Sequence, residues 1–377
     1  MKSEWTELPL GKIIDLVIDY RGKTPKKLGG DWSNTGYRAL SAKNIKTGRI
    51  VQTDTIRYVD ESLYQKWMKD EVRRGDILIT SEAPFGQIFY WDSDEKIVLS
   101  QRLFCIRVNP KYDARFIYYY MTTSAFQGEL AGRSTGTTVI GLRQPELMKC
   151  IIHIPSGENQ HRIASILASI DAKISANQKI NDNLAEQSQA IFDELFPNIS
   201  NGSYTIGNYI TPKRGKNLLS KNAVQGNVPV VAGGLEPSVY HNISNTKAPV
   251  LAISASGANA GYVSLWNIPI WASDSSYIDS SMTNNVYFWY VLLKKRQKEI
   301  FDAQTGSAQP HIYPQHIAGM PIKELEVAKI QEFNTMVTPI FEKIGKNLKE
   351  NTQLETLRDI LLPKLMSGEI DISAIQF

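Results

Sequence analysis

The sequence has little cysteine, little histidine and no long hydrophobic run, and each shortage excludes a class of protein. Its two cysteines, Cys105 and Cys150, are too few for a disulfide framework or a four-thiolate metal site, so a reducing compartment is expected. Apolar runs such as residues 286–293 are far shorter than the ~20 residues that cross a bilayer. The opening residues, MKSEWTELPLGK, contain no apolar signal core. We therefore expect a cytoplasmic protein with no membrane segment.

Motifs of catalysis and of metal or cofactor binding are also missing. No G-x-G-x-x-G occurs, and Gly22-Lys23-Thr24 fails as a phosphate-binding loop because Val17 stands where the first glycine is required. The five histidines form no H-E-x-x-H pair, and no G-x-S-x-G is present. Carboxylates such as Asp274 and Asp279 are not gathered by any motif, so we expect most of the carboxylates to be surface charges. The sequence predicts no catalytic residue, no metal ligand and no cofactor for the chain itself.

An internal repeat is the main feature that the sequence does contain. The chain has 377 residues with 42% hydrophobic and 21% charged residues, which is typical of a folded protein of two or three domains. At an offset of 170 residues, FIYYYM at 116–121 aligns with VYFWYV at 286–291, and Thr135-Gly136 aligns with Thr305-Gly306. The alignment needs no gap from about residue 114 to 196, whereas upstream the two copies drift apart.

The second part of each copy has the heptad pattern of a coiled coil. From Ile163 the seam positions alternate in steps of four and three. After the shift of 170 they are again apolar or asparagine, except at one position, which is Ser188 in the first copy and Arg358 in the second. An antiparallel pair of helices would bring Asn177, Asn181, Asn347 and Asn351 together near the middle, where buried asparagine fixes the register. A parallel pair, or two ordinary core helices, remains open at this point. Pro339 and Pro363 predict kinks in the second helix.

The rest of the chain has the pattern of mixed α/β domains. Short buried strands are expected at 75–80, 97–99, 103–108 and 248–254, and helices with aromatic core stripes at 114–131 and 285–301. The predicted fold class is α+β: two mixed α/β domains, residues 1–157 and 198–325, joined by two long antiparallel coiled-coil helices in a pseudo-two-fold internal repeat. The helices occupy residues 158–197 and 326–377, the latter with a C-terminal tail. A helix of ~39 residues is ~58 Å long and could space the domains.

Charge separates the domains from the helices. Residues 1–157 carry 23 Lys and Arg against 18 Asp and Glu, a net charge of +5, and residues 198–325 carry 10 against 6, a net charge of +4. The helical segments are acidic, with 3 against 6 in residues 158–197 and 6 against 8 in residues 326–377. This separation favours a polyanionic partner for the two domains.

Polar and basic loops in the two domains give the candidate contact residues. RGKTPKK at 21–27 and KRGKN at 213–217 place cations on turns that suit phosphate contacts, and other loops carry side chains that can read base edges. Each of these loops could also be a solvated turn. The candidate DNA-binding residues are Arg21, Lys23, Lys26, Lys27, Lys43, Ser81, Gln87, Arg102, Arg133, Thr135, Thr137, Lys213, Arg214, Lys216, Ser256, Asn259, Thr305, Ser307 and Gln309.

The pattern resembles the DNA-specificity subunits of type I restriction-modification systems. The resemblance spans nearly the whole chain and is specific as an architecture, because the family has no short invariant signature. The second copy departs from it, with AKIQ at 328–331 in place of the glutamate-led start of the first helix. The segments that carry it are WTELPLG at 5–11, GDIL at 75–78, Thr135-Gly136, IIHIP at 151–155, ENQHRIA at 158–164, IDAKI at 170–174, FDELF at 192–196 and LLPKLMSGEI at 361–370.

The resemblance implies a protein that recognises DNA and catalyses nothing. Residues 1–157 and 198–325 would be target-recognition domains, each reading one half of a bipartite sequence in double-stranded DNA, and the helices would space them and dock two methyltransferase subunits. A translocating endonuclease subunit could join the complex. S-adenosylmethionine, ATP and Mg²⁺ would belong to these partners. Two alternatives remain open: a non-catalytic two-headed scaffold that binds protein or glycan, and an enzyme whose active site matches no motif.

Overall fold

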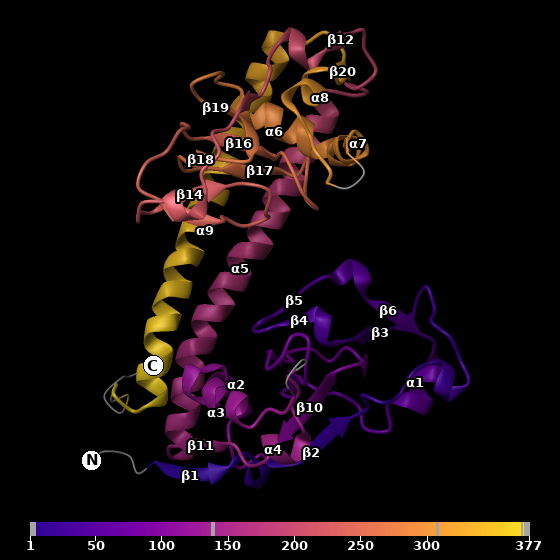
Figure 1. The fold of residues 1–377 in the computed structure, drawn as a ribbon, viewed down its shortest axis with the longest axis vertical. Helices are drawn as coiled ribbons and strands as arrows, with labels where there is room; N and C mark the ends of the chain where they lie inside the picture. Colours follow the sequence, from indigo (N-terminus) through magenta and orange to yellow (C-terminus); the bar gives the residue numbers. More distant parts are fainter. Residues whose placement is uncertain (1–4, 137–139, 307–308, 371, 373–377) are drawn as a thin grey trace. The chain divides into compact units, whose positions relative to one another are not determined.

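The computed structural model describes residues 5–136, 140–306, 309–370 and 372. The chain divides into two compact units, one of Met1–Lys173 with Gln353–Phe377 and the other of Ile174–Thr352. We call them unit 1 and unit 2. Both contain a four-stranded sheet, a three-stranded sheet and a two-stranded ladder in the same order along the chain, although their sequences align poorly in the first part of each copy (Figure 1). Unit 1 has in addition the β4-β5 ladder and helix α1.

Unit 1 is built on a four-stranded antiparallel sheet of order β2-β10-β7-β8. A second sheet has the order β6-β3-β9, and two small ladders pair β1 with β11 and β4 with β5. The strands are β1 (Thr6–Pro9), β2 (Ile14–Asp19), β3 (Tyr37–Leu40), β4 (Ile45–Lys46), β5 (Arg49–Ile50), β6 (Arg57–Val59), β7 (Ile77–Thr80), β8 (Ile88–Tyr90), β9 (Ile97–Leu99), β10 (Leu103–Val108) and β11 (Ile151–Ile154). The short helices are α1 (Glu61–Trp67), α2 (Ala114–Thr122), α3 (Ser124–Gly132) and α4 (Gln144–Leu147).

Unit 2 repeats this topology with fewer residues. Its four-stranded sheet has the order β13-β19-β16-β17, its second sheet β15-β14-β18, and one ladder pairs β12 with β20. The strands are β12 (Tyr204–Thr205), β13 (Lys213–Arg214), β14 (Val228–Val231), β15 (Val239–His241), β16 (Val250–Ser254), β17 (Val263–Trp266), β18 (Trp271–Ala272), β19 (Ser275–Asp279) and β20 (Pro321–Ile322). Its short helices are α6 (Val286–Lys295), α7 (Gln297–Asp302) and α8 (Pro314–Ala318).

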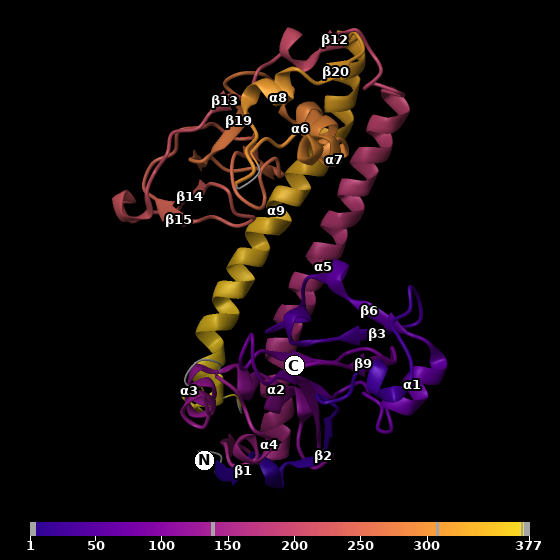
Figure 2. The ribbon, with the colours of Figure 1, turned by 45° about the vertical axis from the view of Figure 1, so that its right-hand side comes forward.

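The four-stranded sheet of each unit is buried on both faces. In unit 2, Leu251 and Ile253 of β16 face a core with α6, whereas Val250 and Ala252 face the second sheet with Val231. Successive side chains of a strand point to opposite faces, so one continuous apolar run supplies both cores. Strands β14 and β15 accordingly lie across the sheet from α6 (Figure 2). Strand β7 divides in the same way, with Ile77 and Ile79 in one core and Leu78 in the other.

The predicted helices 114–131 and 285–301 are each two helices in the structure. The break in unit 1 falls at Thr123, whose hydroxyl accepts a bond from the N–H of Phe126 and caps α3, at 3.3 Å. The aromatic stripe of α2 is buried from Phe116 to Met121, which confirms that it is core. Cys105 and Cys150 are buried free thiols.

Two long helices, α5 (Gly157–Leu195) and α9 (Val327–Met366), contribute to both units and lie side by side within each (Figure 1). Helix α9 continues through Pro339 and Pro363. In unit 2, the Nδ2 of Asn177 donates to Asn351 at 2.9 Å, and the Nδ2 of Asn347 donates to Asn181 at 2.8 Å. The partner numbers fall along α9 as they rise along α5, so the helices are antiparallel and the predicted asparagine cluster is confirmed.

The asparagine cluster leads to a stability prediction. The Nδ2 of Asn181 and the Oδ1 of Asn347 are buried without a hydrogen-bond partner, which carries a desolvation cost. Asn347→Ala should lower the free energy of unfolding by about 1–3 kcal/mol, because it leaves the Asn181 amide with no partner. The double variant Asn181→Leu/Asn347→Leu should raise the urea midpoint above that of the wild type, since leucine suits the seam. Asn183→Ala, at an exposed position of α5, is the control, and a lower midpoint for the double-leucine variant would contradict the prediction.

A second stability prediction concerns Asp76, in the turn before β7. This carboxylate is 2% exposed and accepts bonds from the Nε and Nη2 of Arg107, at 2.9 and 2.8 Å, and from the N–H of Arg73 at 2.8 Å. Asp76→Ala should lower the free energy of unfolding by about 3–5 kcal/mol, because the half-buried guanidinium loses its counter-charge. Urea unfolding measures the change. Asp54→Ala, an exposed aspartate of unit 1, should stay within ~0.5 kcal/mol of wild type.

Candidate nucleic-acid interface

The loops at one end of the four-stranded sheet of unit 1 enclose an open hollow of about 970 Å³. They follow β2 and β7 and precede β10, and Thr135 and residues 141–143 also line the hollow. Five of the predicted contact residues line it: Arg21, Lys27, Ser81, Arg102 and Thr135. The structure thus brings together residues that lie up to 114 positions apart in the sequence, counted from Arg21 to Thr135.

Other lining residues were not predicted. They are Asp19, Gly22, Thr24, Glu82, Gln101, Gly141, Leu142 and Arg143. A search for cations and base-reading loops passes over Asp19 and Glu82 because a lone carboxylate in a loop has no distinctive sequence signal. Their position directly at the ends of β2 and β7 is the signal that could have found them.

Carboxylates hold two of the arginines in the hollow. Arg21 donates from Nε and Nη2 to the two oxygens of Asp19, at 2.8 and 2.6 Å, and from Nη1 to the carbonyl of Leu142 at 3.2 Å. The Nε of Arg102 lies 2.9 Å from Glu82. Such charge-assisted bonds orient a guanidinium and leave its remaining N–H groups able to donate hydrogen bonds.

The lysines of the 21–27 turn differ in what they contact. The Nζ of Lys23 donates to the carbonyl of Trp67 at 2.5 Å and lies 3.9 Å above the ring of Tyr20, and burial lowers the pKa of its ammonium. The Nζ of Lys27 donates to the carbonyl of Gly22 at 2.9 Å. Lys26, and Lys43 in the 3₁₀ turn Ala42–Asn44, are exposed. Among these four lysines, Lys23 is the one held inward.

Two other predicted residues in unit 1 make internal contacts. The side-chain oxygen of Gln87 accepts from the N–H and the hydroxyl of Thr47, at 3.0 and 3.2 Å. Arg133 pairs with Glu129 at 3.0 Å, just after α3. Both side chains therefore support the loops around them. Thr137 lies outside the described residues.

The predicted contact residues of unit 2 lie on β13 and in the loops near the ends of its strands. Arg214, on β13, pairs with Asp274 at 2.6 Å, and the hydroxyl of Ser256 donates to the same carboxylate. The Nδ2 of Asn259 donates to the carbonyl of Gly233 at 3.2 Å. The predicted residues Lys213, Lys216, Thr305 and Gln309 are exposed, and Ser307 lies outside the described residues.

The expectation of surface carboxylates was wrong for Asp279. This residue is 2% exposed, and its Oδ2 accepts from the N–H of Lys247 at 2.8 Å while its Oδ1 accepts from the hydroxyl of Ser281 at 2.6 Å. Asp279 is therefore a buried hydrogen-bond acceptor at the end of β19. Asp274, in contrast, remains partly exposed at the start of the same strand.

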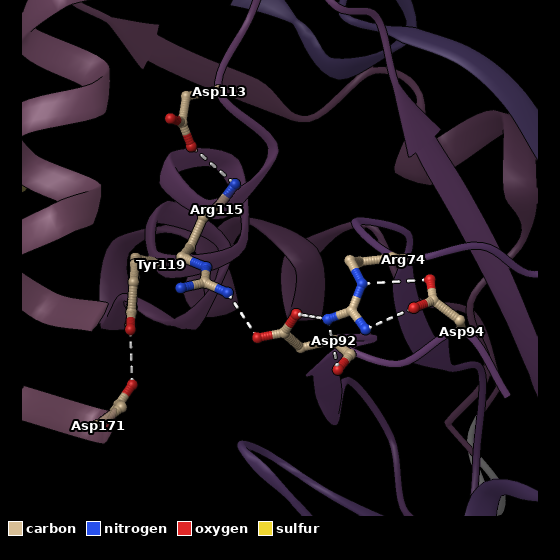
Figure 3. A network of polar contacts seen from close by, with 7 residues as sticks. All are labelled: Arg74, Asp92, Asp94, Asp113, Arg115, Tyr119 and Asp171. Atoms are coloured by element: carbon tan, nitrogen blue, oxygen red, sulfur yellow. Dashed lines mark hydrogen bonds and ion pairs between the residues drawn. The ribbon is translucent and has the colours of Figure 1, made fainter. Parts of the chain in front are cut away.

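Separate polar contacts in unit 1 connect α2 with the loops on one side and with α5 on the other (Figure 3). Arg74 bridges Asp92 and Asp94, and Arg115 also contacts Asp92, at 2.8 Å. On the helix side, the hydroxyl of Tyr119 donates to Asp171 of α5 at 2.6 Å.

Arg358 of α9 also contacts Asp171, at 3.0 Å. Burial and the nearby carboxylate of Asp171 raise the pKa of the Tyr119 hydroxyl, which keeps it a donor. This network anchors α2 against both long helices.

No group of three or more potential metal ligands occurs within the described ranges. In the same part of the chain, none of the helices combines the length and the apolar character that spanning a membrane requires.

The sequence of the chain is similar to those of known proteins. The family described as type I restriction modification DNA specificity domain matches residues 2–186. The type I restriction enzyme MjaIX specificity subunit of Methanocaldococcus jannaschii is 26% identical over 343 residues, which cover 80% of this chain and 79% of that protein. Residues 2–186 therefore match the type I DNA specificity domain, and the chain is similar to a type I specificity subunit over most of its length.

Two further relatives agree with this assignment. The type I restriction enzyme MjaVIII specificity subunit of the same organism is 26% identical over 200 residues, 51% of this chain and 45% of that protein. The crystal structure of the S subunit of a type I restriction-modification system from M. genitalium covers 96% of each chain, with 19% identity and a TM-score of 0.61, which shows a shared fold. The predicted resemblance and fold class are confirmed, and the alternative of a protein- or glycan-binding scaffold is not favoured.

Proposed function

We propose that this chain is a type I specificity subunit that recognises a bipartite DNA sequence for a restriction-modification complex. The chain is a recognition subunit and not a catalyst. The observation that carries the proposal is the hollow of unit 1, where Arg21 and Lys27 of the turn after β2 meet Arg102 of the turn before β10 at one end of the four-stranded sheet. Arginine and lysine in such an arrangement serve both phosphate contacts and base-edge contacts.

The internal repeat supports the bipartite character of the target. The four-stranded sheet of unit 2 has the same order as that of unit 1, and unit 2 carries Lys213 and Arg214 on β13 and Lys216 just after it. Its loop sequences differ from those of unit 1, so the base contacts should differ as well. Each unit is therefore assigned one half-site, and residues 1–157 and 198–325 are assigned as target-recognition domains 1 and 2.

The finer composition of the complex is also part of the proposal. Residues 158–197 and 326–377 form the shared helical spacer against which two methyltransferase subunits dock in the cytoplasm. These subunits bring S-adenosylmethionine, and an endonuclease subunit, where present, brings ATP and Mg²⁺. The first test is to purify the chain with its methyltransferase partners and measure whether duplex DNA is retained in a salt-dependent way.

Exchange of one domain tests the assignment of half-sites. Replacing residues 1–155 by the equivalent part of another specificity subunit should change one half of the methylated sequence and leave the other half unchanged. Single-molecule methylation sequencing of the host genome gives the result directly. A host that lacks the gene provides the baseline, and simultaneous change of both halves would contradict one domain per half-site.

Exposed cations of the 21–27 turn should act on all sequences equally. The variant Lys26→Ala/Lys27→Ala should weaken binding to target and non-target duplexes alike and reduce the slope of log K against log salt by about 2, because each phosphate contact contributes about 1. The slope is measured from 50 to 300 mM salt.

Lys179→Ala, on the acidic helical part, is the matched control and should leave the slope unchanged. A loss of affinity for the target alone would instead mean that Lys26 and Lys27 read bases.

A further inference from the structure

Backbone hydrogen bonds define equivalent positions at the hollow of unit 1 and in unit 2. The N–H of Ser81 donates to the carbonyl of Arg102 at 2.8 Å, and in unit 2 the N–H of Ala255 donates to the carbonyl of Asp274 at 3.1 Å. Each of these bonds directly follows the pairing of the two central strands, β7 with β10 and β16 with β19. Arg102 and Asp274 therefore stand at the same place in the two copies.

A backbone bond from Leu142, just before α4, supports the same equivalence. The N–H of Leu142 donates to the carbonyl of Ser81 at 2.9 Å, and the N–H of Ile312 donates to the carbonyl of Ala255 at 2.9 Å. The two donors are 170 residues apart, the offset of the repeat. Two independent backbone hydrogen bonds thus show that Ser81 of unit 1 is equivalent to Ala255 of unit 2.

The strand register identifies a second pair of equivalent positions. Asp19 of β2 lies opposite Phe104 of β10, two residues after Arg102. Arg214 of β13 lies opposite Ser276 of β19, which is two residues after Asp274. By sequence alone, the shared RGK at 21–23 and 214–216 would instead pair Arg21 with Arg214. In the structure, Asp19 and Arg102 of unit 1 correspond to Arg214 and Asp274 of unit 2, so the charge is reversed at both places.

Arg102 and Asp274 each form an ion pair with a neighbouring residue and remain partly exposed to solvent. The Arg102 side chain is 51% exposed beside Glu82, and the Asp274 side chain is 33% exposed beside Arg214 and Ser256. A half-exposed carboxylate on a surface that meets DNA would repel phosphates. It becomes favourable where it accepts a hydrogen bond from a base amino group.

The backbone of Arg102 is strained, with a φ of +62°. Glycine adopts this region at no steric cost, whereas a side chain makes it unfavourable. Strained backbone positions cluster at functional sites, so the strain supports a role for this side chain in the hollow. Arginine stands here although glycine would fit the turn better.

We propose that Arg102 reads guanine in the half-site of unit 1 and that Asp274 reads cytosine, through its N4 amino group, in the half-site of unit 2. The inference rests on the proposed function and deepens it. Arginine donates two bonds to the O6 and N7 of guanine, and aspartate accepts from the N4 of cytosine, so reversed charge at one structural position selects complementary base edges. Glu82 and Arg214 are positioning residues that orient these two side chains.

The test is competition binding by the intact chain in complex with its methyltransferase subunits, using target duplexes with every base pair replaced in turn. Arg102→Gly should abolish a preference for guanine of roughly 5- to 150-fold at one position of the first half-site, and should leave the second half-site unchanged. Asp274→Asn should do the same for cytosine in the second half-site only. Gln52→Gly is the matched control, because Gln52 is exposed and also has a positive φ, of 49°.

Substitution of 7-deazaguanine for the guanine read by Arg102 refines the test. It removes the N7 acceptor, so the wild type should lose affinity, whereas Arg102→Gly should lose nothing further. Unchanged preferences in both variants, or uniform weakening on all sequences, would overturn the inference while the proposed function stands. A wild-type complex with no sequence preference would overturn both.

Discussion

The burial of one antiparallel sheet on both faces is the constraint on which the rest of each unit depends. Strands β7 and β10 in unit 1, and β16 and β19 in unit 2, send alternate side chains into a helical core and into a core shared with a second sheet. The register of these strands is fixed, because a shift of one residue would move every side chain of a strand into the opposite core. The loops that leave these strands therefore start from fixed points. Polar side chains on them can be held to the accuracy that recognition of base edges requires.

The sequence predicted the features that depend on local periodicity. The seam of α5 and α9, the strands β7, β10 and β16 and the aromatic core of α2 follow from hydrophobic spacing within one segment. The asparagine cluster could be predicted as well, because a repeat at constant offset fixes which seam positions meet in an antiparallel pair.

The candidate site could be predicted only in part, since its geometry depends on long-range register. Ser81 and Arg102 are neighbours through pairing of β7 with β10, which no local pattern specifies. Similar sequence pairs Arg21 with the wrong residue, Arg214, for the same reason, because insertions shift the offset between the two copies. The strand register places Asp19 opposite Phe104 and Arg214 opposite Ser276, which gives the correct equivalence. Lys23, Gln87 and Arg133 are of residue types that often contact DNA. In the structure their side chains form hydrogen bonds or ion pairs with Trp67, Thr47 and Glu129. Composition alone cannot separate a side chain that supports a loop from one that faces outward.

The two thiols of the chain have a practical consequence for spectroscopy. Cys105 and Cys150 are both buried, and burial raises the pKa of Cys150 to about 11, so little reactive thiolate is present near neutral pH. A cysteine introduced at an exposed site such as Lys43 would then be the one readily alkylated by a maleimide dye. Fluorophores could be attached to each unit without first removing the native sulfur atoms. Energy transfer between them would report the separation of the units in solution.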